Sequence, residues 1–124
     1  MPKVVHFEIT ADNPERAVKF YAQTFDWKIE KWGAMDYWMM TGDKGAMGID
    51  GAIMKRDGLA GVVDYIGVPS VDESVKKIKT SGGKIITPKT EIPKIGYFAI
   101  FKDTEGNTLG VFEALPESMM SQPK

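Results

Sequence analysis

The same order of expected elements occurs twice along the chain. In residues 3–54 an alternating strand is followed by a helix and three strand-like segments, and residues 62–114 repeat that order with little residue identity. The charged, glycine-containing stretch 55–61 separates the two runs as a linker. We therefore expect one α+β domain over residues 1–115, built from two tandem β-α-β-β-β modules, with a flexible C-terminal tail at 116–124.

Each expected helix has its own start signals. Asn13 can cap the first helix, and Pro14 suits its first position. Ser70 and Glu73 have capping-box spacing at the start of the second helix, which the pair Gly82–Gly83 should end. Because one helix can cover only one face of its sheet, the other face of each module is either solvated or closed over a cavity.

The only histidine of the chain, His6, lies in the first expected strand. The apolar face of this strand should meet the helix and carries Val5, Phe7 and Ile9. The other face carries His6, Glu8 and Thr10. His6 therefore points to the side that a ligand could reach, either as a site residue or as a hydrogen-bonded histidine on a polar strand face. In the second run Tyr65 occupies the position of His6.

Charge and composition exclude several classes of partner and site. Sixteen Lys and Arg against seventeen Asp and Glu give a net charge of −1, so neither nucleic acid nor an anionic membrane is an expected partner. The chain has no cysteine, which excludes disulfides, thiolate metal sites and iron–sulfur clusters. We expect a cytoplasmic protein, since its first residues do not resemble a signal peptide and no apolar run is as long as a membrane span.

Three segments and the doubled order are found together in one known family. The segments are VVHFEI (4–9), NPERAVKFYAQTFDWKI (13–29) and KDTEGNTLGVFE (102–113). With them, residues 3–114 resemble the vicinal oxygen chelate superfamily, which contains glyoxalases, bleomycin-resistance proteins and extradiol dioxygenases. Details such as MDYWMM, GAIM and FAIFKDTEGN look closest to bacterial glyoxalase-like proteins of uncharacterised activity. The resemblance implies a cupped mixed sheet with the helices on its outer face, and a homodimer.

In metal-dependent members of that family, side chains from the first and last strand of each half hold a divalent ion in the cup. The resemblance places His6 and Glu113 at two of these positions, and Ala52 and Tyr65 at the other two. Alanine cannot bind a metal and tyrosine rarely does, so only half of the ligand set is present. The implied cofactor is a weakly held Zn, Ni, Mn or Fe ion, or none. His6 and Glu113 could instead be hydrogen-bonded to each other without a metal.

Glu113 and several residues of nearby strands are further candidates for the cup. Glu113 alternates with Val111 and Leu109, so it would be the one charged group on its strand face, or else a surface carboxylate. Tyr65 could stack on a planar ligand, and Asp50 has the parity of Ala52 but also suits a turn. The remaining pocket candidates, whose parity the sequence leaves open between pocket and core, are Trp38, Tyr97 and Phe98.

The resemblance implies two main functions. One is a binding protein that holds a small molecule in the cup without needing a metal, as antibiotic-sequestering members do; Ala52 and Tyr65 favour it by leaving space and a stacking surface. The other is a metal-dependent glyoxalase-like lyase or isomerase, in which the ion polarises vicinal oxygens while Glu113 moves a proton. A partner protein that mainly dimerises is a third possibility.

Overall fold

The computed structural model describes residues 1–42, 45, 47–58 and 61–116, and within them the chain forms eight strands and two helices. Residues 117–124 of the expected tail lie outside the described part. The chain divides into two compact units. The first is His6–Val63, and the second joins Met1–Val5 to the described residues from Asp64 onward. Met1–Val5 group with the second unit because the backbone N–H of Gly67 donates to the Lys3 carbonyl and Val5 contacts Gly67.

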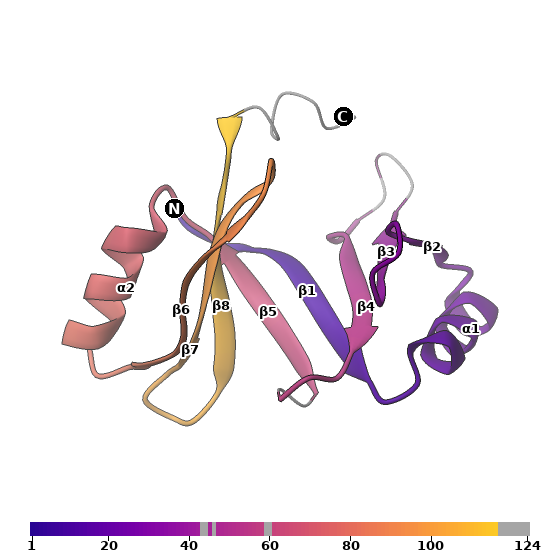
Figure 1. The fold of residues 1–124 in the computed structure, drawn as a ribbon, viewed down its shortest axis with the longest axis horizontal. Helices are drawn as coiled ribbons and strands as arrows, with labels where there is room; N and C mark the ends of the chain where they lie inside the picture. Colours follow the sequence, from indigo (N-terminus) through magenta and orange to yellow (C-terminus); the bar gives the residue numbers. More distant parts are fainter. Residues whose placement is uncertain (43–44, 46, 59–60, 117–124) are drawn as a thin grey trace. The chain divides into compact units, whose positions relative to one another are not determined.

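The first unit has a four-stranded mixed sheet with one helix (Figure 1). In spatial order the strands are β2-β3-β4-β1, with β1 and β4 parallel and the other pairs antiparallel. Helix α1 packs on β2, β3 and β4. The elements are β1 (Val4–Ala11), α1 (Pro14–Phe25), β2 (Lys28–Lys31), β3 (Tyr37–Thr41) and β4 (Gly51–Lys55).

The second unit repeats this arrangement with the strand order β5-β8-β7-β6. Here β5 and β8 are parallel, the other pairs are antiparallel, and α2 packs on β6, β7 and β8 (Figure 1). The elements are β5 (Val62–Gly67), α2 (Val71–Thr80), β6 (Lys84–Ile92), β7 (Gly96–Lys102) and β8 (Thr108–Ala114). The predicted α+β class and the doubled β-α-β-β-β order are confirmed.

Both helices begin at the predicted caps. The Asn13 side chain accepts a hydrogen bond from the backbone N–H of Arg16 at 3.1 Å, and Pro14 is the first residue of α1. The Ser70 hydroxyl accepts from the backbone N–H of Glu73, also at 3.1 Å. Each cap satisfies an amide that the first helical turn leaves without a partner.

The apolar core of each unit lies between its helix and its sheet. Under α2, buried Val71, Ala99, Phe101 and Val111 form a cluster, and Ile66 packs against it. On the α1 side the contacts are aromatic: Trp27 stacks on Tyr21 of α1 at 4.8 Å between ring centroids, and Phe7 of β1 lies 6.0 Å from Trp27. Phe7 and Ile66 therefore lie on the helix-covered faces of their sheets, as the alternation predicted.

Strand β6 is longer than predicted. The sequence indicates a short strand over 84–88, but β6 continues through Pro88 to Ile92. Its pairing with β7 shifts register between Ile85 and Thr87 and again between Thr87 and Thr90. Proline has no backbone N–H to donate to a neighbouring strand. Pro88 is tolerated because β6 is an edge strand and its pairing is irregular at this point.

The turn between β7 and β8 is organised by one carboxylate. Asp103 accepts hydrogen bonds from the backbone N–H groups of Glu105 and Asn107 and from the Asn107 side-chain amide. These donors, those of Asn107 first, hold the pKa of the Asp103 carboxyl below its usual value. The predicted DTEGN turn is therefore fixed by side-chain hydrogen bonds and brings β8 back alongside β7.

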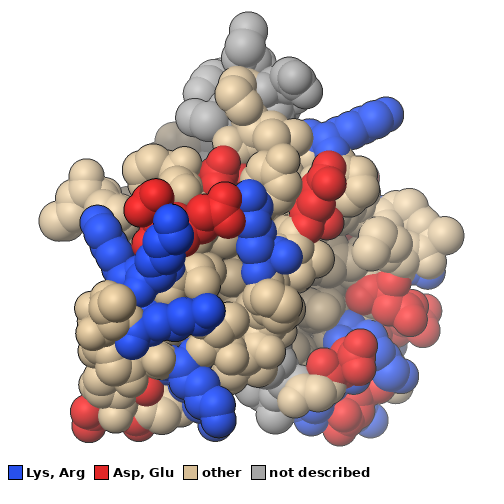
Figure 2. Space-filling model, turned by 60° about the vertical axis from the view of Figure 1, so that its left-hand side comes forward, with Lys and Arg blue, Asp and Glu red and all other residues tan. Residues whose placement is uncertain are grey.

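Acidic and basic side chains are mixed on the surface. Figure 2 shows Lys and Arg side chains interspersed with Asp and Glu side chains on one face. The structure also contains pairs of opposite charge, such as Lys89 with Asp72 at 2.9 Å. Neither of the helices in the described part of the chain has the length and apolar character needed to cross a membrane.

Replacing Gly110 by alanine should destabilise the second unit. A Cβ atom there would clash with the ring of Tyr65, which is only 8% exposed and cannot easily move. We expect a loss of about 1–3 kcal/mol in the free energy of unfolding, measured by urea denaturation. Lys102→Ala at the exposed end of β7 is the control and should change it by less than about 0.5 kcal/mol. Equal stability of Gly110→Ala and wild type would contradict the close packing of Tyr65 on β8.

Candidate functional site

His6, Tyr37 and Glu8 form a hydrogen-bonded cluster in the first unit, which we call the polar trio. The Tyr37 hydroxyl donates to Glu8 Oε2 at 2.7 Å, and His6 Nε2 lies 3.0 Å from the same hydroxyl oxygen. His6 Nε2 and Glu8 Oε2 are 3.8 Å apart. Tyr37 therefore stands between an imidazole and a carboxylate and contacts both.

The direction of the hydrogen bonds follows from the chemistry of the three groups. An ionised carboxylate only accepts, so the Tyr37 hydroxyl hydrogen is directed at Glu8. The hydroxyl oxygen is then left to accept, and His6 donates Nε2–H to it. In the neutral imidazole this places the lone pair on Nδ1. The trio thus fixes both the orientation and the tautomer of His6.

The polar trio is partly shielded from solvent. The side chains of His6 and Glu8 are 25% and 15% exposed. A carboxylate that is mostly removed from water needs donors to offset its lost hydration, and Tyr37 supplies one at short distance. A ligand that reaches this cluster would meet preoriented polar groups rather than mobile surface side chains.

Strand register places the trio on the sheet face opposite α1. His6 and Glu8 alternate with Phe7, which lies on the α1 side. Glu8 pairs with Ala52 of β4, and Tyr37 pairs with Met54, so these residues share one face. Ala52 is fully buried. Its small side chain is therefore packed inside the protein, on the same sheet face as the trio.

In the second unit, aromatic side chains occupy the corresponding face, opposite α2. Tyr65 alternates with Ile66 of the α2-side cluster and pairs with Gly110 of β8. Phe98 meets Tyr65 edge to face, with ring centroids 6.5 Å apart. The residue of β8 beside Tyr65 is thus a glycine. Tyr65 and Phe98 give this face an aromatic character and provide no usual metal ligand.

Glu113 lies on the α2 side of its sheet. Its Oε1 accepts a hydrogen bond from the backbone N–H of Val71, the first residue of α2, at 2.9 Å. It shares its face with Val111 of the core and pairs with Tyr97. A carboxylate at a helix N-terminus interacts favourably with the unpaired amides and the helix dipole. The hydrogen bond to the first residue of α2 therefore explains the position of the Glu113 side chain.

A lysine completes the surroundings of Glu113. Lys89 of β6 donates to Asp72 at 2.9 Å and lies 4.4 Å from the ring centroid of Tyr97. Its hydrogen bond to Asp72 raises the pKa of the Lys89 ammonium, and the charge of Glu113 acts in the same direction, against a smaller effect of burial. Lys89 therefore remains a cation that stabilises the two carboxylates.

The other predicted pocket residues divide between the faces. Trp38 is 9% exposed and alternates with Tyr37, so it lies on the α1 side with Ile53, its partner in β4. Tyr97 packs against the α2-side cluster. Asp50 accepts from the backbone N–H of Gly42 at 2.8 Å, which is the turn role left open by the sequence. Of the aromatic candidates, Phe98 and Tyr65 are on the face opposite their helix.

The residues of the polar trio do not fit a complete divalent-metal site. His6 and Glu8 are suitable ligands, but the third member is a tyrosine hydroxyl, a rare one. Among residues 1–42, 45, 47–58 and 61–116, no three His, Asp or Glu side chains converge on one point. The predicted pairing of His6 with Glu113 joins the two units and stays a prediction.

Two members of the trio, Glu8 and Tyr37, were not among the predicted site residues. The signal for Tyr37 is present in YWMMT (37–41), where buried Trp38 and Met40 alternate with it. This alternation turns Tyr37 to the other face, where its hydroxyl needs a polar partner. The partner itself, on a strand 29 residues earlier in the sequence, depends on which strands are neighbours.

Comparison with known proteins agrees with this fold. Residues 3–111 match the family "Glyoxalase/Bleomycin resistance protein/Dioxygenase superfamily". A glyoxylase-like domain-containing protein from Didymella fabae is 31% identical over 111 residues, which cover 82% of this chain and 85% of that protein.

Two solved structures share the fold at low sequence identity. A hypothetical protein from Bacillus halodurans C-125 superposes with a TM-score of 0.68 at 15% identity, covering 99% of this chain and 98% of that one. A methylmalonyl-CoA epimerase in complex with methylmalonyl-CoA and NH4+ gives 0.66 at 14% identity, covering 94% and 97%.

Removing the Glu113 carboxylate should destabilise α2. Glu113→Ala leaves the Val71 amide without its acceptor, and we expect a loss of about 1–2 kcal/mol in the free energy of unfolding. Glu91→Ala is the matched control, because Glu91 is an exposed carboxylate of β6 that pairs with the same Tyr97. It should cost less than about 0.5 kcal/mol. If urea denaturation gave the same loss for both variants, Glu113 would not have the helix-capping role.

Proposed function

The chain belongs to the glyoxalase, bleomycin-resistance and dioxygenase superfamily, and from this premise we propose that it binds a small molecule at the polar trio without a tightly bound metal. The observation that carries the proposal is the hydrogen-bonded arrangement of His6, Tyr37 and Glu8 on the face opposite α1. Polar groups held at fixed positions beside an apolar surface are the usual composition of a small-molecule site.

The groups of the trio define what kind of ligand they suit. The imidazole of His6 and the carboxylate of Glu8 are polar groups that can hydrogen-bond to a ligand. Met54 of β4, which is partly exposed, supplies apolar contact on the same face. We infer a small ligand with a hydroxyl or N–H donor directed at His6 or Glu8 and an apolar part against β4.

The residues available as metal ligands favour a binding role over a metal-dependent lyase or isomerase. Two protein ligands, His6 and Glu8, would hold an ion weakly, and Glu113 is committed to the N-terminus of α2. The complex of a methylmalonyl-CoA epimerase with its substrate supports the idea that this fold accommodates small molecules. An assignment to the bacterial glyoxalase-like proteins, a homodimeric state and a cytoplasmic location are parts of the same proposal.

Ligand screening with matched variants tests the binding role. A panel of small aromatic and electrophilic metabolites is screened by thermal shift, where a compound at 100 times its Kd should stabilise the wild type by about 2.7 kcal/mol. We expect hits that are lost in His6→Ala and Glu8→Gln. Glu30→Gln is the control, because Glu30 is an exposed carboxylate of neighbouring β2 and should leave the hits unchanged. EDTA should also have no effect.

Three results would overturn the proposal. A panel whose hits all survive in His6→Ala and Glu8→Gln would place the ligand elsewhere, and a panel without any hit would leave the trio without a ligand of the proposed class. A full equivalent of a divalent ion in wild-type protein purified without chelator, absent from His6→Ala, would favour the metal-dependent enzyme instead.

A further inference from the structure

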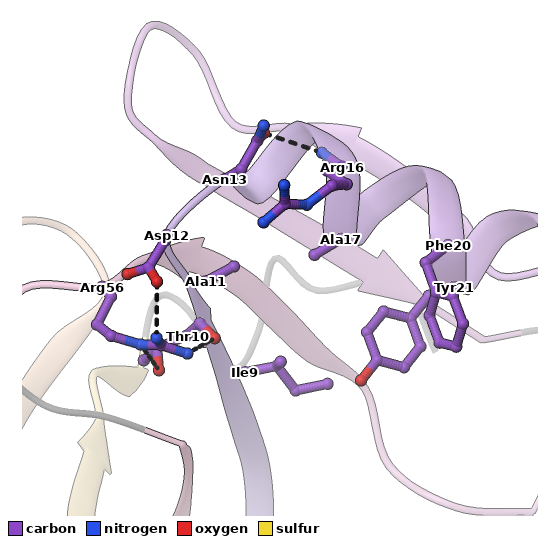
Figure 3. A pocket seen from close by; sticks show the side chains of 10 residues that line it. All are labelled: Ile9, Thr10, Ala11, Asp12, Asn13, Arg16, Ala17, Phe20, Tyr21 and Arg56. Atoms are coloured by element: carbon purple, nitrogen blue, oxygen red, sulfur yellow. Dashed lines mark hydrogen bonds and ion pairs between the residues drawn. The ribbon is translucent and has the colours of Figure 1, made fainter.

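A hollow lies in the first unit, at the end of β1 and the beginning of α1 (Figure 3). Its volume is about 460 Å³, within the range of small-ligand pockets. It is lined by residues of the β1 end, by one face of α1 and by Arg56, which follows β4. None of the polar trio lines it, so a ligand here would be independent of the proposed function.

One end of this hollow is rigid and close to neutral in charge. Arg56 donates from Nη1 to Asp12 Oδ2 at 3.1 Å, from Nη2 to the Thr10 carbonyl at 3.1 Å and from Nε to the Thr10 hydroxyl at 3.3 Å. The Thr10 hydroxyl in turn donates to the Gly61 carbonyl at 2.7 Å. The charge of Arg56 is thus balanced by Asp12, and its fork is held in one orientation.

Arg16 supplies the positive charge that is not balanced. Its side chain extends from α1 toward the end of the hollow that holds Asp12 and Arg56 (Figure 3). In the described part of the chain, the Arg16 guanidinium has no hydrogen bond or ion pair, and only its backbone N–H is used, by Asn13. With Arg56 and Asp12 compensating each other, the charged side chains of the hollow sum to +1.

The other wall is apolar. Phe20 and Tyr21 of α1 meet edge to face with ring centroids 5.0 Å apart, and Ile9 and Ala17 lie beside them (Figure 3). Phe20 is 55% exposed although it is large and apolar. A ligand body packed here would remove part of this surface from water. Charge and apolar surface therefore lie at different sides of the same hollow.

We propose that this hollow binds a small organic carboxylate with an aromatic or similarly apolar body, its carboxylate on Arg16 and its ring against Phe20 and Tyr21. A single guanidinium matches a planar carboxylate through two parallel hydrogen bonds. A phosphate dianion would need a second uncompensated cation, because Arg56 is already paired with Asp12. A monoanion is therefore the better match for the net charge.

Benzoate is the probe, and benzamide is its neutral counterpart of the same shape. Binding is followed by amide chemical shifts in NMR titrations of the full chain. We expect saturable shifts at residues 9–13, 15–17, 20, 21 and 56 with benzoate and none with benzamide. Arg16→Gln should weaken benzoate binding about tenfold or more, since it removes charge-assisted hydrogen bonds. Lys19→Gln removes an exposed cation of the same helix that does not line the hollow and should leave the Kd within about twofold.

Two further variants separate this site from the polar trio and from nonspecific attraction. Phe20→Ala should also weaken benzoate binding, because it removes the apolar wall. His6→Ala should leave benzoate binding unchanged while abolishing binding at the trio. Equal affinity of Arg16→Gln and Lys19→Gln, or shifts that do not saturate, would overturn the proposal. Loss of benzoate binding in His6→Ala would assign the probe to the trio and overturn it as well.

Discussion

The parallel pairing of the first and last strand of each unit is the constraint on which the rest of the structure depends. A tight turn cannot join parallel strands, so the chain must cross over between β1 and β4 and between β5 and β8. Each crossover contains one helix, which covers one face of its own four strands. Every side chain of the sheet is thereby assigned either to the core under a helix or to the opposite face, and a change of one residue in register would exchange the two sets.

The same alternation gives the two units different chemistry. In the first unit, the face opposite α1 holds an imidazole, a phenol and a carboxylate that hydrogen-bond to one another. In the second unit, the face opposite α2 holds Tyr65 and Phe98, and the carboxylate of Glu113 is turned to the helix side. The glycines differ in a related way: Gly51 lies against Phe7 on the α1 side, whereas Gly110 lies against Tyr65 on the face opposite α2. The two units share the backbone order and not the placement of polar groups.

Local patterns in the sequence predict much of this fold because they report local physics. Capping residues Asn13 and Ser70, the parity of His6 and the turn at Asp103 all depend on near neighbours and are found as predicted. The expectation for Glu113 came from the family resemblance, whereas its position agrees with its alternation with Val111 and Leu109, both of which face α2. The partnership of His6 and Glu8 with Tyr37 could not be predicted, since it depends on β3 and β4 pairing in a particular register. The continuation of β6 beyond Pro88 was not predicted either, because a proline usually indicates the end of a strand.

The central claim is that the hydrogen bond to the Tyr37 hydroxyl holds His6 in one tautomer, with its proton on Nε2. Because His6 is the only histidine, its two imidazole nitrogens can be observed by 15N NMR without assignment ambiguity. At about pH 8, where an imidazole is normally neutral, the account predicts an Nε2–H tautomer with an unprotonated Nδ1, and a clear change in both 15N shifts in Tyr37→Phe. An Nδ1–H tautomer in the wild type, or identical imidazole shifts in Tyr37→Phe, would contradict it.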